Sequence, residues 1–280
     1  MMALLWMCAA LTSFSLLAIG ARELSGDISV YQTLLVRSAV GLLFILLLMT
    51  IQRKSSLMFT RRPGLHVFRN LFHFAGQYGW FVGIGLLPLA EVFALEFTVP
   101  FWTVIIAAVF LKETITRRKI VAVMLGTLGV LLIVRPGYEI INVASFIVLA
   151  AALCFAIVHS STKSLASSEK PLTIIFYMCV VQLPLGLFLS LPVWKWPDSV
   201  QWMWLLLVGM TALSAHFCMA KAMQYAEITR IVTLDFLRLP LIALVGVLLY
   251  SEPFEIALMA GGLLMLLGNF INLYNPRILS

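Results

Sequence analysis

Ten apolar runs occupy most of this chain, and they constrain its fold more than any other feature. A helix that crosses a bilayer needs about 20 mostly apolar residues, because lipid offers its backbone no hydrogen bonds. The runs cover approximately residues 3–20, 28–51, 65–86, 89–111, 118–134, 143–161, 171–192, 200–220, 228–249 and 254–273. They predict an all-α integral membrane protein with ten transmembrane helices.

Composition agrees with this class. Of 280 residues, 62% are hydrophobic and only 11% are charged, whereas about a quarter of residues are charged in soluble domains. The four cysteines lie in apolar runs without the spacing of metal ligands or of a disulfide framework. No nucleotide-binding loop is present, so we expect no direct drive by ATP. We expect neither a cofactor nor a metal.

The chain divides into two similar halves. Five runs precede the turn Arg135-Pro136-Gly137 and five follow it, which predicts one repeat over 1–137 and a second over 138–280. Leu95-Glu96-Phe97 returns 139 residues later as Leu234-Asp235-Phe236. Because five is odd, the second half must enter the membrane from the opposite side. Inverted repeats around a central cavity are a building plan of secondary transporters.

Positive charges predict the orientation. Twelve Lys and Arg residues fall in the loops of one side or at the C-terminus, and three fall on the other side. Cytoplasmic loops carry such an excess. We therefore expect a multi-pass protein of a bacterial-type inner (plasma) membrane with both termini cytoplasmic. This loop placement also argues against nucleic acid as the reason for the net charge of +7.

Charged residues inside the runs are the first candidates for a site. Glu96 and Asp235 lie well within the fourth and ninth runs, and Arg238 follows Asp235 by one turn. Arg37 lies in the middle of the second run, and Arg69 lies near the start of the third. Each central charge costs about 2.5–3.5 kcal/mol on insertion scales, so it needs a partner or a wet cavity. One hypothesis places both acids on a central cavity; the alternative is that arginines neutralise them and fix helix register.

A polar stripe marks the third run. Arg69, His73, Gln77 and Trp80 recur every three or four residues, which places them on one helix face. His216 is the equivalent of Gln77 in the second half. The stripe suits either an amphipathic ligand or a polar contact between helices, and His216 suits either a proton carrier or a core residue.

Four residues are candidate hinges or gates. Glu113 and Glu252 occupy equivalent places before the fifth and tenth runs, where a carboxylate favours a helix N-terminus. Capping of those helices is the main interpretation, and a gating contact is the alternative. Pro100 and Pro240 follow the two acids by about one turn, where each frees a backbone carbonyl and permits a kink.

These motifs resemble the drug/metabolite transporter superfamily, in its ten-span branch with two EamA-type repeats. The resemblance is carried by Val36-Arg37-Ser38, the segment 88–100, Leu111-Lys112-Glu113 and Tyr250-Ser251-Glu252-Pro253. It implies a central cavity, alternating access and small organic substrates, such as amino acid derivatives or nucleotide-like metabolites. Many members carry a Trp-Gly pair in the first span, where this chain has Phe14-Ser15.

We therefore expect a secondary-active exporter or exchanger of a small polar or amphipathic metabolite, with protons as a candidate coupling ion. Glu96 and Asp235 would bind a cationic group or the proton. The resemblance leaves open uptake of a vitamin or nucleotide-like metabolite, of the riboflavin or S-adenosylmethionine type, and a homodimer. A polytopic enzyme is the alternative of another class, but no catalytic motif is found. A packing or receptor protein would instead bury both acids in ion pairs.

Overall fold

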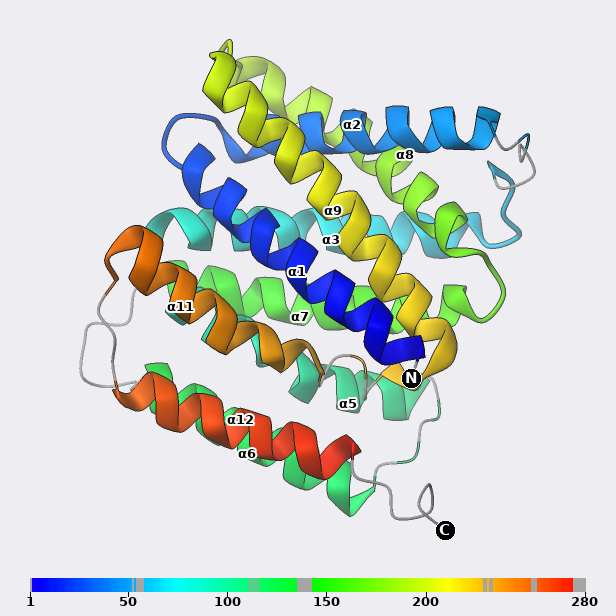
Figure 1. Ribbon diagram of the computed structural model, residues 1–280. Helices are drawn as coiled ribbons and strands as arrows, with labels where there is room; N and C mark the ends of the chain where they lie inside the picture. The colour runs from blue at the N-terminus through cyan, green and yellow to red at the C-terminus, as the bar shows by residue number, and fades with distance from the viewer. Residues whose placement is uncertain are drawn as a thin grey trace.

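The computed structural model describes residues 2–51, 53, 58–110, 112, 114, 116–134, 143–228, 231, 234–252 and 256–273. Within these residues the chain is helical and forms no β-strand, as the sequence predicts (Figure 1). The helices in chain order are α1 (Met2–Leu24), α2 (Val30–Ile51), α3 (Pro63–Leu86), α4 (Leu89–Glu96), α5 (Val99–Phe110), α6 (Arg117–Val134), α7 (Val143–Ala166), α8 (Pro171–Ser190), η2 (Leu191–Val193), α9 (Ser199–Tyr225), η3 (Asp235–Leu237), α11 (Arg238–Tyr250) and α12 (Ile256–Leu273).

The apolar runs become helices whose ends agree with the sequence to within a few residues. Six segments of the described chain are long and apolar enough to cross a membrane. They are α1, α2, α4 together with α5, α7, α8 together with η2, and α9. Large apolar side chains such as Leu43, Phe188 and Leu248 are exposed, while Arg69 is buried. Exposed apolar side chains and a buried arginine suit a protein that is surrounded by lipid rather than by water.

The fourth and ninth runs are interrupted at the two acids. α4 ends at Glu96, and α5 begins at Val99 after a turn in which the Leu95 carbonyl accepts from the Thr98 N–H at 3.1 Å. In the second half, a 3₁₀ turn begins at Asp235 and leads into α11. Pro100 falls in the first turn of α5, where its missing N–H leaves no hydrogen bond unmade. Pro240 takes a similar place in α11. The chain therefore breaks before each proline.

Helices from the two halves pack in antiparallel pairs. α1 lies along α9, and α3 lies along α7; α2 pairs with α8, and α6 pairs with α12 (Figure 1). In each pair the start of one helix meets the end of the other. For example, Trp6 near the start of α1 meets Phe217 of α9, and Gln32 at the start of α2 donates to the Lys195 carbonyl beyond α8 at 2.6 Å.

Candidate functional site

Arg238 joins the two buried acids. Its Nη2 donates to Glu96 Oε1 at 2.7 Å and to Asp235 Oδ2 at 2.8 Å. The three residues are 9%, 6% and 2% exposed for Glu96, Asp235 and Arg238. The ends of α4, η3 and α11 thus bring them into one cluster, which we call the acid–arginine triad. The acids are ion-paired, as the alternative to a cavity-lining pair anticipated.

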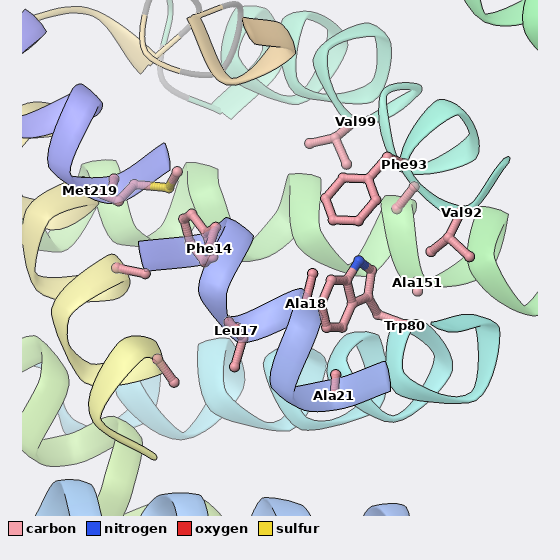
Figure 2. Packing of buried hydrophobic residues seen from close by; sticks show 14 of the residues in the cluster. Phe14, Leu17, Ala18, Ala21, Trp80, Val92, Phe93, Val99, Ala151 and Met219 are labelled. Atoms are coloured by element: carbon pink, nitrogen blue, oxygen red, sulfur yellow. The ribbon is translucent and has the colours of Figure 1, made fainter. Parts of the chain in front are cut away.

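Aromatic side chains enclose the triad. Trp80 Nε1 donates to Glu96 Oε2 at 2.7 Å, and the Arg238 guanidinium lies 4.8 Å from the ring centres of both Phe14 and Phe93. Figure 2 shows Trp80 beside Phe93, with Ala18 of α1 next to the indole. Cation–π contacts gain strength where water is excluded. Trp80 is 5% exposed, so in this structure it serves the triad and offers little free surface for stacking.

The triad retains unused polar capacity. Two carboxylates face a single guanidinium, so its formal charge is negative when both acids are ionised. Asp235 Oδ1 and Arg238 Nε are buried and make no hydrogen bond with any residue in the described part of the chain. Buried polar atoms without partners are costly. Asp235 Oδ1 is therefore an acceptor that can take up a proton.

The polar stripe of α3 forms a second cluster. His73 Nδ1 lies 2.9 Å from Gln182 Nε2 of α8, and His73 Nε2 lies 2.7 Å from Gln77 Nε2. Arg37 of α2 donates from Nη2 to Gln182 Oε1 at 3.2 Å. Arg37, His73, Gln77 and Gln182 therefore connect three helices, and together with Arg69 and Asn70 we call them the amide–arginine network.

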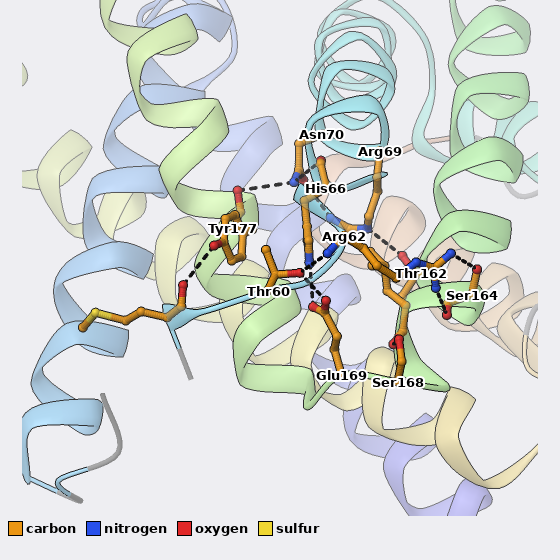
Figure 3. Close-up of polar contacts among 12 residues, drawn as sticks. Thr60, Arg62, His66, Arg69, Asn70, Thr162, Ser164, Ser168, Glu169 and Tyr177 are labelled. Carbon is orange, nitrogen blue, oxygen red and sulfur yellow. Dashed lines mark hydrogen bonds and ion pairs between the residues drawn. The ribbon is translucent and has the colours of Figure 1, made fainter. Parts of the chain in front are cut away.

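Arg69 is held by neutral partners. Its Nε donates to Thr162 Oγ1 and its Nη1 to Asn70 Oδ1, both at 2.7 Å. Figure 3 shows these contacts above the end of α7. Gln182 Nε2 also reaches Asn70 Oδ1, at 3.5 Å. Arg69 is thereby linked to Arg37 through two side-chain amides.

His216 lies between the network and the triad. Its ring centre is 4.6 Å from that of His73 and 5.3 Å from that of Phe14, with edge-to-face geometry in both cases. Phe14 in turn lies against Arg238. The structure thus brings together all nine residues predicted to bind substrate or to couple transport, in two adjoining clusters.

The predicted gate residue Glu252 lies apart from these clusters. Glu252 lies at one end of the bundle, where its Oε1 accepts from Arg22 Nη2 at 2.9 Å and from the Leu89 N–H at 3.0 Å. Glu252 thus binds the N-terminus of α4, because folding brings the two halves together there. The expected cap of its own following helix stays a prediction, because residues 253–255 lie outside the described ones. Glu113 lies outside the described residues.

The other end of the bundle is also tied. His66 Nε2 lies 2.6 Å from Glu169 Oε2, and Thr60 Oγ1 donates to the second oxygen of that carboxylate. Arg62 Nη1 donates to the Ser164 carbonyl at 2.8 Å (Figure 3). These contacts join the start of α3 to the end of α7.

Two cavities open near Glu252 rather than at the triad. One of about 470 Å³ is lined by Arg22 and Pro88 among others, and one of about 270 Å³ lies between the α1–α2 turn and the end of α3. Neither is lined by Glu96 or Asp235. Glu96 and Asp235 meet through Arg238.

Sequence reasoning missed Gln182, Asn70, Thr162 and Arg22. Gln182 had a signal, since it is a lone amide in the middle of an apolar run, where polar groups are costly. Asn70 adjoins Arg69 but lies off the stripe of three- and four-residue spacings. Thr162 and Arg22 lie near helix ends, where polar residues are ordinary. Their contacts are fixed by packing between distant segments.

Comparison with known proteins identifies a transporter family and named transporters that resemble this chain. The profile of the EamA-like transporter family matches residues 1–135 and 142–274. The chain is 31% identical to a riboflavin transporter of Vibrio cholerae over 88% of this chain and 84% of that protein. It is 23% identical to an S-adenosylmethionine uptake transporter of Rickettsia felis over 78% and 74% of the two chains.

An exporter is also among the similar proteins. A pseudopaline exporter of Pseudomonas aeruginosa is 26% identical over 90% of this chain and 89% of its own length. One solved structure superposes with a TM-score of 0.80 at 17% identity, and the match covers 99% of this chain and 98% of that one. That likeness supports the fold alone.

Proposed function

Because this chain belongs to the EamA-like transporter family and is a multi-pass membrane protein, we propose that it is a secondary carrier of a small polar or amphipathic metabolite. It works by alternating access in the inner membrane. Among the chains that it resembles, the named proteins are transporters and not enzymes, and we set the enzyme alternative aside.

The proposed architecture is ten spans in two inverted five-helix repeats, 1–137 and 138–280. Helix pairing supports it. Suppose that α1, α2 and α3 correspond to α7, α8 and α9. A two-fold axis that exchanges them also exchanges the pair α1–α9 with the pair α3–α7 and maps the pair α2–α8 onto itself. All three pairs are observed. Corresponding helices also run in opposite directions in Figure 1.

Equivalent side-chain contacts support the same architecture. Arg22 of α1 donates to the carbonyls of Ile84 and Leu87. Lys163 of α7 donates to the carbonyls of Met223 and Ala226, at 2.8 and 2.7 Å. Met223 and Ala226 lie 139 residues beyond Ile84 and Leu87, the same offset that relates Glu96 to Asp235. Two such contacts at opposite ends of the bundle are what an inverted repeat produces.

The observation that carries the function is the bond between Arg238 and Glu96 at the point where both halves interrupt their helices. Discontinuous helices with buried charges form the binding sites of many secondary transporters. We propose that a cationic group of the substrate, or a proton, competes with Arg238 for Glu96 and Asp235. Exchange of partners would release the two halves from each other.

The two tied ends then act as gates. Contacts of Glu252 with Arg22 and Leu89 close one end, and contacts of Glu169 with His66 and Thr60 close the other. With both ends closed and the acids ion-paired, this conformation is an occluded intermediate. Pro100 and Pro240 serve as hinges beside the triad. The end of the bundle that contains Glu169 also carries the Lys- and Arg-rich loops. This end faces the cytoplasm, as do both termini.

Direction is the finer part of the proposal. We favour export or exchange, and uptake is the second candidate because similar chains include an uptake transporter and an exporter. The test uses purified protein in proteoliposomes with riboflavin, S-adenosylmethionine and a set of amino acids. Saturable flux of one of them supports a carrier. Acceleration by internal substrate would indicate exchange, acceleration by a pH gradient would indicate proton coupling, and the absence of flux across the panel would count against transport.

A further inference from the structure

Arg37 and Arg69 are buried cations without a counter-charge. They are 3% and 2% exposed, yet within the described ranges no carboxylate lies within 4.0 Å of either guanidinium. Arg22 and Arg238, in contrast, each have a carboxylate partner. An unpaired buried charge costs several kcal/mol. A fold that retains two of them side by side has a use for them beyond packing.

Neutral side chains hold the two guanidinium groups in place. Gln182 Oε1 accepts from Arg37 at 3.2 Å, and Asn70 Oδ1 accepts from Arg69 at 2.7 Å. The two amides meet at 3.5 Å. Amide oxygens orient a guanidinium but leave its charge intact. The network is therefore pre-arranged and remains positive.

Donors of both arginines remain unused. Arg37 makes its bonds through Nη2 alone, to Gln182 and at 3.8 Å to Met178 Sδ. Arg69 uses Nε and Nη1. The remaining guanidinium N–H groups donate to no residue that the structure describes. Gln77 Oε1, in the same network, is buried without a partner among those residues. Guanidinium forks match the geometry of carboxylate and phosphate oxygens.

We propose that Arg37 and Arg69 form an anion-binding subsite for a carboxylate or phosphate group of the transported molecule. Gln182 and Asn70 are its positioning residues. The inference rests on the proposed transport function and adds that the substrate carries a negative group. Seven residues of α3 separate His73 of the network from Trp80 of the triad, about 10 Å along the helix. The two clusters are therefore far enough apart to bind different ends of one substrate molecule.

The test compares probes that differ in one anionic group. Riboflavin 5′-phosphate is paired with riboflavin, and S-adenosylmethionine is paired with its decarboxylated form. Affinity is measured on the purified full chain by titration of intrinsic tryptophan fluorescence. We expect the anionic member of at least one pair to bind at least tenfold more tightly than its partner. The pair that responds tells phosphate from carboxylate.

Variants assign the preference to the two arginines. Arg37→Gln loses one hydrogen bond to a side-chain amide, that of Gln182. It should reduce the affinity ratio within the responding pair to near one, and so should Arg69→Gln. Arg69→Gln also loses the hydrogen bonds to Thr162 and Asn70 and could fail to fold. In that case Arg69→Lys replaces it, and we expect its affinity ratio to lie below that of the natural protein. Lys170→Gln removes an exposed charge at the start of α8 and should leave the ratio unchanged.

The inference is overturned if the members of both pairs bind equally or not at all, or if the ratio survives in the Arg37 and Arg69 variants. Flux of the anionic probe at the natural rate in Arg37→Gln would refute the subsite while leaving the carrier function standing. Failure of every substrate in proteoliposomes refutes the carrier function itself.

Discussion

Arg238 Nη2 lies 2.7 Å from Glu96 Oε1, across a separation of 142 residues. The contact joins the helix break of one half to the helix break of the other, inside a bundle whose outer surface is apolar. An ion pair in such a place contributes little net stability, because desolvation offsets the attraction, but removal of one partner is costly. The triad therefore suits partner exchange better than it suits a static brace.

Replacement of the central arginine should destabilise the fold. In Arg238→Met, Glu96 and Asp235 lose their shared counter-charge while both remain buried. We expect the free energy of unfolding to fall by about 3–5 kcal/mol, measured by urea denaturation in detergent. Adding Glu96→Gln should recover part of this loss, because the two residues interact directly. Stability of Arg238→Met equal to that of the natural protein would show that the ion pairs do not form.

The indole donor of Trp80 should have a measurable contribution. Trp80→Phe removes the N–H that binds Glu96 Oε2, and a hydrogen bond to a charged group contributes about 1.5–3 kcal/mol. Trp6→Phe is the matched control, since Trp6 Nε1 is buried without a partner in the described residues. We expect a clear drop in melting temperature for Trp80→Phe and little change for Trp6→Phe. Equal drops would mean that ring size, and not the hydrogen bond, matters.

Close approach of α2 and α8 should depend on Gly186. A Cβ at Gly186 would lie 2.9 Å from the Leu35 Cα, so Gly186→Ala must push the two helices apart. Overpacking of this kind costs about 1–3 kcal/mol. At Gly262 of α12 a Cβ would meet nothing within 4 Å, and Gly262→Ala should be neutral or stabilising because alanine favours a helix. Thermal unfolding of the two variants distinguishes the outcomes.

Loss of the Glu252 contacts should open one end of the bundle. Glu252→Gln weakens the bonds to Arg22 and to the Leu89 N–H. A cysteine at Thr33, which lines the smaller cavity, should then react several-fold faster with a membrane-impermeant maleimide in a cysteine-free background. Glu23→Gln is the control, because Glu23 is exposed at the same end and, among the described residues, accepts a hydrogen bond only from Tyr250. Unchanged labelling in Glu252→Gln would remove Glu252 from the gate.

Local sequence signals predicted the elements of this fold well. Helix ends such as Val143 and Ser190 fall within a few residues of the apolar run ends, because burial in lipid leaves the backbone little alternative to a helix. The buried acids were also visible, since a carboxylate in an apolar run is conspicuous. The prolines pointed to the right segments, but the breaks come at the acids, where helix ends from the two halves meet.

Partners across the bundle could not be predicted. Glu252 reads as the start of its own helix, yet its carboxylate binds Leu89, which is 163 residues away. The sequence offered Arg37, Arg69 and Arg238 as equal candidates to neutralise the acids, and only three-dimensional packing assigns that role to Arg238. The same packing leaves Arg37 and Arg69 with amides, an assignment that no local pattern carries.

The most direct test of the triad's role is to reconstitute the variants Glu96→Gln and Asp235→Asn in proteoliposomes. The quantity measured is the flux of the substrate identified for the natural protein. Asp27→Asn, which alters an exposed acid, is the matched control. We predict that both triad variants fold, that each loses at least tenfold in flux, and that Asp27→Asn retains the natural rate. Natural flux in both folded triad variants would contradict the proposal that the two acids exchange partners during transport.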